Sequence, residues 1–245
     1  MGIKSRKTWK EWQSKLHFFE VWLKERHAKT EIRFWSYMSD MFSEEISTLS
    51  NSGGLCLDVG CGSGEYLYRF VEVGRYYGIG IDPLKEPSLK IFKDRIKGLQ
   101  ISEKIELING VGEYLPIKED SVQLCIMTST LDHVSNPDQT LRESHRVLAS
   151  DGHLILLQSV VWKKTPNFKE KTHMQEFTMA DLKDLLAQFR IEKVKRLFIV
   201  PPQIPIPDKL LAYNKTYKAL SRIFGIIIRW FKPYVTIIKS KKTKE

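Results

Sequence analysis

Residues 55–67 constrain this chain more than any other stretch. They run from an apolar strand into a bend that holds Gly60, Gly62 and Gly64, and then into a helix that begins near Ser63. Glycine adopts positive φ and lets a ligand approach the bare backbone. The helix N-terminus after the bend offers unpaired N–H groups and the positive end of a dipole. The stretch therefore predicts a ligand site suited to a carboxylate or a phosphate.

The spacing of the glycines distinguishes between kinds of ligand. The pattern is Asp-x-Gly-x-Gly-x-Gly from Asp58 onward, whereas dinucleotide-binding turns have Gly-x-Gly-x-x-Gly and need no acid two residues ahead. A second acid, Asp82, closes the next apolar run at 76–82. A nucleotide dehydrogenase and a glycine-rich turn without a ligand are the alternatives.

Together these two segments resemble motif I and its acidic partner in class I S-adenosylmethionine-dependent methyltransferases, in particular the small-molecule type 11-like domain. The resemblance covers residues 35–200 and a last strand near the C-terminus. It implies that the cofactor is S-adenosyl-L-methionine and that the chain is an enzyme, a methyltransferase. The family's chemistry requires no metal ion, because the sulfonium methyl group is already electrophilic.

After the turn, predicted strands alternate with predicted helices. The strands lie at 55–59, 76–82, 104–108, 122–128, 152–160 and 191–200, and the helices at 64–73, 84–97, 137–148 and 179–189. This α/β alternation predicts a parallel sheet with helices on both faces. Right-handed crossovers place Gly60 and Asp82 in one crevice. By resemblance, 234–238 is an antiparallel last strand beside the sixth, which completes a Rossmann-like seven-stranded sheet.

The composition is that of a globular domain with additions. The chain has 245 residues, of which 42% are hydrophobic, so it can bury a full core. Its cysteines, Cys56, Cys61 and Cys125, form no C-x-x-C pair, and core packing explains them better than disulfide or metal chemistry. No apolar signal region follows the basic start, and no apolar stretch reaches transmembrane length. A cytoplasmic location is therefore expected.

The net charge of +10 is concentrated at the two ends of the chain. Residues 1–33 carry nine Lys and Arg against four Asp and Glu, and residues 209–245 carry ten against one. Residues 34–208 carry twenty against twenty-four, so the middle is net acidic. A domain that grips nucleic acid should not be acidic. Nucleic acid is therefore an unlikely partner, and the basic character belongs to the appendages.

Four segments are expected along the chain. Residues 1–50 carry apolar residues at helical spacing and predict an N-terminal helical cap, with plain core packing as the alternative. Residues 51–200 form the cofactor-binding core. Residues 201–233 form a proline-rich connector and a basic amphipathic helix, inserted before the last strand and basic tail at 234–245.

The amphipathic helix, at about 208–231, has a basic face opposite an apolar one. It would extend from the sheet edge that carries the glycine turn, so we expect it on the substrate side. A lid, a surface helix that contacts anionic lipid at the inner membrane face, and a homodimer contact are three interpretations. Core packing with a solvated basic face is the fourth. The hypothesis is that this helix brings the site to a membrane-bound or lipophilic acceptor, such as a lipid-linked sugar.

The resemblance assigns cofactor contacts to ten residues. The glycines would meet the methionine end of the cofactor, Asp58 would position the turn, and Asp82 would accept the ribose hydroxyls. The full set is Asp58, Gly60, Cys61, Gly62, Gly64, Asp82, Pro83, Gly112, Glu113 and Thr128. Val111 stands where the family commonly has an acid that meets the adenine, which leaves the backbone of Gly112 and Glu113 as candidates. Gln123 is a second departure, because family members often have Phe-Asp there.

Two histidines and an aspartate are the catalytic candidates. Asp132 and His133 lie in the loop after the fourth strand, which faces the methyl group in small-molecule members of the family. A histidine there could take the proton from a hydroxyl as it is methylated. His173 matches a histidine that many such members carry before a later helix. A helix-entry or packing role is the alternative for His133. Asp132 could orient this histidine or cap the following turn, and His173 is a substrate-loop candidate.

These observations predict an S-adenosylmethionine-dependent methyltransferase that acts on a small molecule, glycan or lipid, at oxygen. An RNA methyltransferase is the first alternative, motivated by the basic ends. The loop after the fourth strand lacks the Asn/Asp-Pro-Pro-aromatic motif of amino-directed base methylases, which disfavours it. A cofactor-binding protein without catalysis is the second alternative, motivated by Val111 and Gln123.

Overall fold

A computed structural model describes residues 45, 49, 53–62, 64–73, 76–83, 102–166, 173–197 and 234–243. The predicted helix at 84–97 and the predicted connector and amphipathic helix of 201–233 lie outside these residues. So does the predicted N-terminal cap, apart from Glu45, which is helical, and Leu49.

Seven strands form one sheet in the order β3-β2-β1-β4-β5-β7-β6. Their bounds are β1 Gly54–Val59, β2 Tyr76–Asp82, β3 Ile105–Asn109, β4 Val122–Thr128, β5 Leu148–Val160, β6 Phe189–Leu197 and β7 Tyr234–Lys242. The first five strands pair in parallel, and β7 lies antiparallel between β5 and β6. The predicted seven-stranded sheet with an antiparallel last strand beside the sixth is confirmed.

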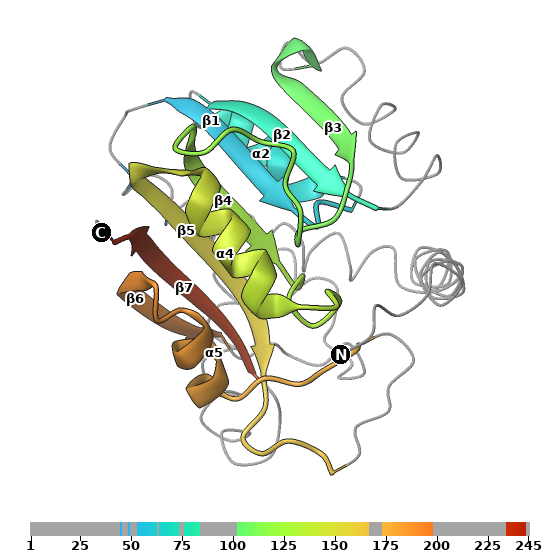
Figure 1. Cartoon of the computed structure of the whole chain (residues 1–245), viewed down its shortest axis with the longest axis vertical. Coiled ribbons are helices and arrows are strands. Elements are labelled where there is room, and N and C mark those ends of the chain that lie inside the picture. The colour runs from blue at the N-terminus through green and yellow to red at the C-terminus, as the bar shows by residue number, and fades with distance from the viewer. Residues whose placement is uncertain are drawn as a thin grey trace, which may run out of the picture.

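Helices cover both faces of this sheet. Helix α4, Pro137–Val147, and helix α5, Met179–Leu185, lie on the near face in Figure 1, and helix α2, Glu65–Val73, lies behind β1 and β2. A short 3-10 turn, η1, spans Ser102–Lys104 before β3. Among the described residues, no helix is both long and apolar enough to cross a bilayer.

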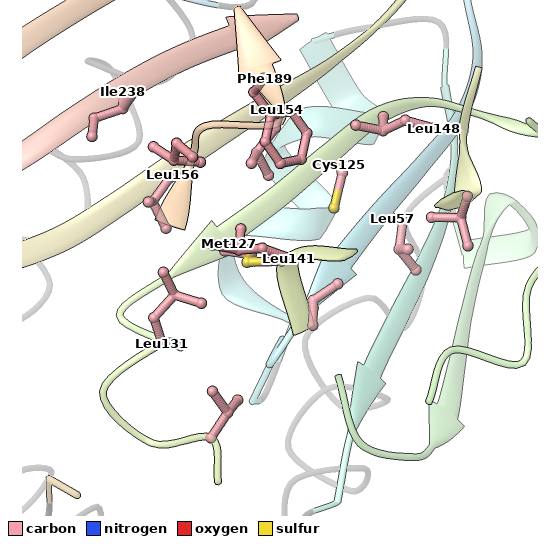
Figure 2. Packing of buried hydrophobic residues seen from close by; sticks show 14 of the residues in the cluster. Leu57, Cys125, Met127, Leu131, Leu141, Leu148, Leu154, Leu156, Phe189 and Ile238 are labelled. Atoms are coloured by element: carbon pink, nitrogen blue, oxygen red, sulfur yellow. The ribbon is translucent and has the colours of Figure 1, made fainter. Parts of the chain in front are cut away.

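The core has two layers because successive strand residues point to opposite faces. In β4, Cys125 and Met127 pack with Leu141 of α4 (Figure 2), whereas Leu124 and Ile126 pack with residues of α2 on the other face. A strand buried on both faces needs a continuous apolar run, which β4 has. All three cysteines are buried free thiols.

Several predicted boundaries were wrong around the second half of the sheet. Helix α5 ends at Leu185 rather than 189, since Phe189 is already the buried first residue of β6. Strand β5 begins at Leu148 rather than 152. Strand β7 continues to Lys242, beyond the predicted end at 238, because it pairs with a neighbour on each side.

Candidate active site

The glycine turn joins the end of β1 to α2. Gly60, Gly62 and Gly64 have φ of +74°, +52° and +69°, which side-chain-bearing residues rarely adopt. A Cβ at Gly60 would lie 2.5 Å from the side chain of Thr130, whereas a Cβ at Gly62 would meet nothing within 4 Å. Gly60 is therefore needed for packing, and the space over Gly62 is open to a ligand.

Asp82 lies beside this turn, as predicted. Strands β1 and β2 pair in register, with Val59 opposite Ile81, so their carboxyl ends meet at one edge. The Gly62 N–H donates a hydrogen bond of 2.8 Å to Asp82 Oδ2. The Gly60 N–H donates one of 2.8 Å to the Ile81 carbonyl. The second strand thus holds the turn in the conformation that leaves Gly62 accessible.

Asp58 is a fully buried carboxylate at the end of β1. Neither of its oxygens has a hydrogen-bond partner in the described part of the chain. Burial, and then the charge of nearby Asp82, raises the pKa of Asp58 well above its usual range. A buried carboxylate without a partner is costly unless a donor or a cation reaches it. The ammonium and sulfonium of S-adenosylmethionine would supply such a charge, so Asp58 and the open Gly62 fit this cofactor.

Cys61 contributes its backbone rather than its thiol to the turn. Its side chain is buried and faces β2, where a Cβ on Gly80 would come within 2.7 Å of the Cys61 sulfur. Burial, followed by the charges of Asp58 and Asp82, raises the pKa of the Cys61 thiol, which keeps it neutral. Pro83 directly follows Asp82 at the end of β2 and is half-buried.

The third-strand candidates have structural contacts of their own. A Cβ on Gly112 would come within 2.8 Å of Thr140 and 2.9 Å of Val59, so glycine is required for close packing of α4. Glu113 is buried, and its Oε1 accepts hydrogen bonds from the N–H groups of Ser135 at 2.8 Å and Asn136 at 3.2 Å. This carboxylate organises the start of α4, a role that the sequence did not reveal.

The loop after β4 packs directly on the glycine turn through Thr130. Its hydroxyl donates a hydrogen bond of 2.9 Å to the carbonyl of Val59, the residue before Gly60. Thr128 ends β4, and Ser129 has a positive φ of 50°, a conformation that is sparsely populated outside glycine and clusters at functional sites. Thr130 was not among the residues expected from the sequence, although its position two residues after a predicted strand was a usable signal.

Asp132, His133 and His173 come together at this edge of the sheet. Asp132 Oδ2 lies 3.4 Å from His173 Nε2, and Asp132 Oδ1 lies 3.9 Å from His133 Nε2. The two imidazole rings are stacked with their centroids 4.8 Å apart. The His133 N–H also donates to the Thr130 carbonyl at 2.9 Å, so this cluster lies one turn from the residue that contacts the glycine turn.

A cavity of about 620 Å³ lies near the carboxyl end of β5. The start of α4, the residues after β5, the segment after His173 and α5 line it. None of its described lining residues belongs to the glycine turn. The turn remains the candidate cofactor site, because the orphaned carboxylate and the accessible backbone lie there.

Comparison with known proteins agrees with this geometry. Residues 57–156, from within β1 to within β5, match the model of a family described as a methyltransferase domain. The ubiquinone/menaquinone biosynthesis C-methyltransferase of a Ruegeria species is 26% identical over 106 residues, which are 43% of this chain and 42% of that protein. The demethylmenaquinone methyltransferase of Lactobacillus johnsonii is 28% identical, over 44% of this chain and 45% of that protein. The chain thus spans less than half the length of these curated relatives.

Solved structures share the fold over more of the chain. Geranyl diphosphate C-methyltransferase from Streptomyces coelicolor, in complex with Mg²⁺, a substrate analogue and S-adenosyl-L-homocysteine, has a TM-score of 0.62 at 13% identity and covers 83% of this chain and 76% of its own. The [4+2]-cyclase SpnF has a TM-score of 0.63 at 18% identity and covers 84% and 82%. At these identities the likeness establishes the fold alone.

The family match includes the glycine turn, Asp82 and the loop after β4, which are the parts that the geometry brings together. The pairing of β1 with β2 and the antiparallel β7 beside β6 are as predicted from the resemblance to this family. Residues 57–156 are therefore similar to a methyltransferase domain, on a sheet of the class I methyltransferase type.

Proposed function

We propose that this chain transfers a methyl group from S-adenosylmethionine to an oxygen of a small-molecule, glycan or lipid acceptor. The observation that carries the proposal is the cluster of Asp132, His133 and His173. Thr130 connects this cluster to the glycine turn, because its hydroxyl donates to the Val59 carbonyl and its carbonyl accepts from the His133 N–H. An oxygen acceptor needs a base as it is methylated, whereas the cofactor needs none for its own activation.

Each group has a defined role in this proposal. The cofactor supplies an electrophilic methyl group when bound. The hydrogen bond from Gly62 to Asp82 keeps the glycine turn in the conformation that leaves room for the ligand. Asp58 compensates positive charge on the ligand. His133 takes the acceptor proton, and the charge of Asp132, whose Oδ1 lies 3.9 Å from His133 Nε2, stabilises the imidazolium. His173, on the other oxygen of Asp132, shares that carboxylate. Orientation and exclusion of water supply the rest of the rate enhancement.

Methylation at carbon is the second candidate, because the Ruegeria relative and the Streptomyces neighbour are both named C-methyltransferases. A carbon acceptor also loses a proton during the reaction, so the same base would serve. The two outcomes differ in the product, since a methyl ether or ester and a carbon-bound methyl group have distinct NMR shifts.

The test is incubation with methyl-labelled S-adenosylmethionine and fractionated cell extract. We expect label in the small-molecule, glycan or lipid fraction, bound to oxygen. Label in RNA would replace the proposal with the nucleic-acid alternative. Cofactor binding in calorimetry without label transfer to any fraction would support the non-catalytic alternative.

A pair of histidine variants tests the assigned base. His133→Ala should lower turnover by about 10²- to 10⁴-fold while cofactor affinity stays the same, because the imidazole acts on the acceptor proton. The matched control is His153→Ala on β5, a histidine 3.4 Å from Glu192 and remote from the turn, which should leave turnover unchanged. Unchanged turnover in His133→Ala would remove it as the base.

Membrane contact, a homodimer and a cytoplasmic location at the inner membrane face are further parts of the proposal. They rest on the basic amphipathic sequence at 208–231, which lies outside the described residues. Flotation with anionic liposomes tests the lipid contact, and sedimentation tests the dimer. Absence of lipid binding, with full activity on a soluble acceptor after deletion of 209–231, would eliminate the membrane role.

A further inference from the structure

The cluster of Asp132, His133 and His173 has the composition of a metal site as well as of a base. Two imidazole nitrogens and one carboxylate oxygen can be chosen that all lie within 4.8 Å of one another. We propose that these three side chains bind a divalent transition-metal ion, which in turn would hold the acceptor. This inference rests on the proposed function only for its second half, since ion binding itself needs no methyl transfer. With the ion bound, His133 would be one of its ligands rather than the free base, and the ion would acidify a bound acceptor hydroxyl so that its proton passes to water.

The separations are close to those of a coordination sphere. Ligand atoms about 2.1 Å from a tetrahedral ion lie about 3.4 Å from each other. Asp132 Oδ2 and His173 Nε2 are separated by 3.4 Å, and Asp132 Oδ1 and His133 Nε2 by 3.9 Å. The widest pair of ligand atoms, within 4.8 Å, would need to approach by up to about 1.4 Å to reach tetrahedral spacing. The two histidine side chains are 23% and 35% exposed, so they have room to rotate inward.

Asp132 provides a second, independent indication. Its side chain is only 6% exposed, and Oδ1 is buried without a hydrogen-bond partner among the described residues. A buried carboxylate oxygen that lacks a donor carries a desolvation cost. A cation bound between this carboxylate and the imidazoles would offset that cost.

The backbone holds the two ligand-bearing segments together before any ion binds. The Met174 N–H donates a hydrogen bond of 2.8 Å to the carbonyl of Asp132. Gln175 Nε2 donates to the carbonyls of Leu131 at 3.0 Å and Val134 at 3.2 Å. These two bonds join the segment after His173 to the residues that flank Asp132 and His133, more than 40 positions earlier in the sequence. Such preorganisation reduces the conformational cost of binding an ion.

The donor set indicates the class of ion. Mg²⁺ and Ca²⁺ prefer oxygen ligands, whereas imidazole suits Zn²⁺, Fe²⁺ and related ions. Two histidines and one carboxylate leave coordination positions unfilled, as in catalytic rather than structural sites. Because both histidine side chains are partly exposed, the unfilled coordination positions of the ion would be accessible from solvent. An acceptor with two neighbouring oxygens, such as a vicinal diol or catechol, could fill them and be oriented for methylation.

Binding is tested on the full chain without cofactor or acceptor. After removal of metals with a chelator, Zn²⁺ and Mn²⁺ are titrated separately by calorimetry, and Co²⁺ is followed by its visible absorption, which reports nitrogen ligation. We expect one ion per chain. His173→Ala should weaken binding by at least about 100-fold, more than the 10- to 100-fold typical of losing an outer-shell partner. His153→Ala is the matched control and should bind the ion as the wild type does.

Three outcomes would overturn the inference. They are no ion bound, an affinity unchanged in both His173→Ala and Asp132→Asn, or an equal loss in the His153→Ala control. If the chain binds the ion but methylates nothing, the metal site is supported and the proposed function is refuted. A chain that methylates at full rate in chelator and binds no ion retains the proposed function, with the cluster acting as a base alone.

Discussion

Gly62 and Gly60 serve different purposes at neighbouring positions of one turn. Both have positive φ, but only Gly62 faces open space. A methyl group at Gly62 would therefore occupy ligand space without a clash in the free protein. At Gly60 the same methyl group would displace Thr130 and the loop after β4.

We predict that Gly62→Ala folds but binds S-adenosylmethionine at least about tenfold more weakly. The left-handed conformation costs alanine about 1–2 kcal/mol, which corresponds to a few degrees in Tm. Calorimetry with the cofactor and thermal unfolding measure the two effects. Gly60→Ala should lose considerably more stability, and equal stability losses in both variants would contradict the packing difference.

We predict that Asp58→Asn stabilises the cofactor-free protein at neutral pH. The pKa of Asp58 is raised in the native state, so above the unfolded value of about 3.9 the native state binds more protons and stability falls as pH rises. Asparagine removes both this pH dependence and the buried charge, so the free energy of unfolding should rise by about 1–3 kcal/mol near pH 7. Urea unfolding at several pH values measures it.

The same substitution should weaken cofactor binding, because the compensating carboxylate is lost. Asp138→Asn is the control, since Asp138 is exposed and paired with Arg142 on α4, and it should change neither property appreciably. A variant at position 58 that is less stable than wild type at neutral pH would show that the carboxylate is satisfied in the native state.

At the scale of elements, α4 is attached to the segment after β3 by one arginine. Arg146 donates to the carbonyls of Ile117 at 3.1 Å and Leu115 at 3.0 Å and pairs with Glu143 at 2.8 Å. Glu143 in turn accepts from the Leu115 N–H at 2.9 Å. The pairing with Arg146 lowers the pKa of Glu143. This network holds the Gly112–Glu113 segment against the helix.

We predict that Arg146→Ala lowers the free energy of unfolding by about 2–3 kcal/mol, because charge-assisted hydrogen bonds to two carbonyls are lost together. Arg142→Ala on the same helix is the matched control. Its exposed pair with Asp138 is of the i,i+4 kind, and its loss should cost about 0.3–0.5 kcal/mol. Urea unfolding measures both variants, and similar losses would refute the attachment role.

Gln123, which departs from the family pattern, links two strands of the sheet. Its Oε1 accepts a hydrogen bond of 2.7 Å from the Leu55 N–H, at the start of β1. The sequence marked Gln123 as a departure from the family pattern. The structure gives it the task of joining β4 to β1, 68 residues apart. This departure therefore does not by itself argue against catalysis.

At the scale of the whole molecule, the last described segment completes the sheet. Strand β7 pairs with β5 through eight registered positions and with β6 through eight. Strand β6 has no other strand partner among the described residues. The Lys193 ammonium at this edge also binds the buried Glu45 at 2.7 Å, which places Glu45 against β6.

We predict that a chain truncated after residue 233 does not fold cooperatively, because β6 and one edge of β5 would lose their hydrogen-bonding partner. Circular dichroism and urea unfolding of the truncated chain, compared with the full chain, are the measurements. Lys193→Ala is the milder comparison, which should lose about 1–3 kcal/mol while remaining folded. A truncated chain with a wild-type unfolding transition would contradict the role given to β7.

The sequence by itself determined the glycine turn, the alternation of strands and helices and the acid at the end of β2. These features are local: positive φ at glycine, apolar runs of strand length and a cap such as Thr178 act within a few residues. The sheet topology confirmed the fold that this pattern suggested, and the match of residues 57–156 to a methyltransferase domain agrees with the expected cofactor.

Only the tertiary structure decided how distant segments meet. His173 joins Asp132 across 41 residues, Glu113 reaches Ser135 across 22, and β7 extends into the lysine-rich tail because strands on both sides accept it. Such contacts depend on the path of the backbone around the sheet. Local preference carries no information about that path, so the sequence could name His133 and His173 separately, whereas the fold brought them to one carboxylate.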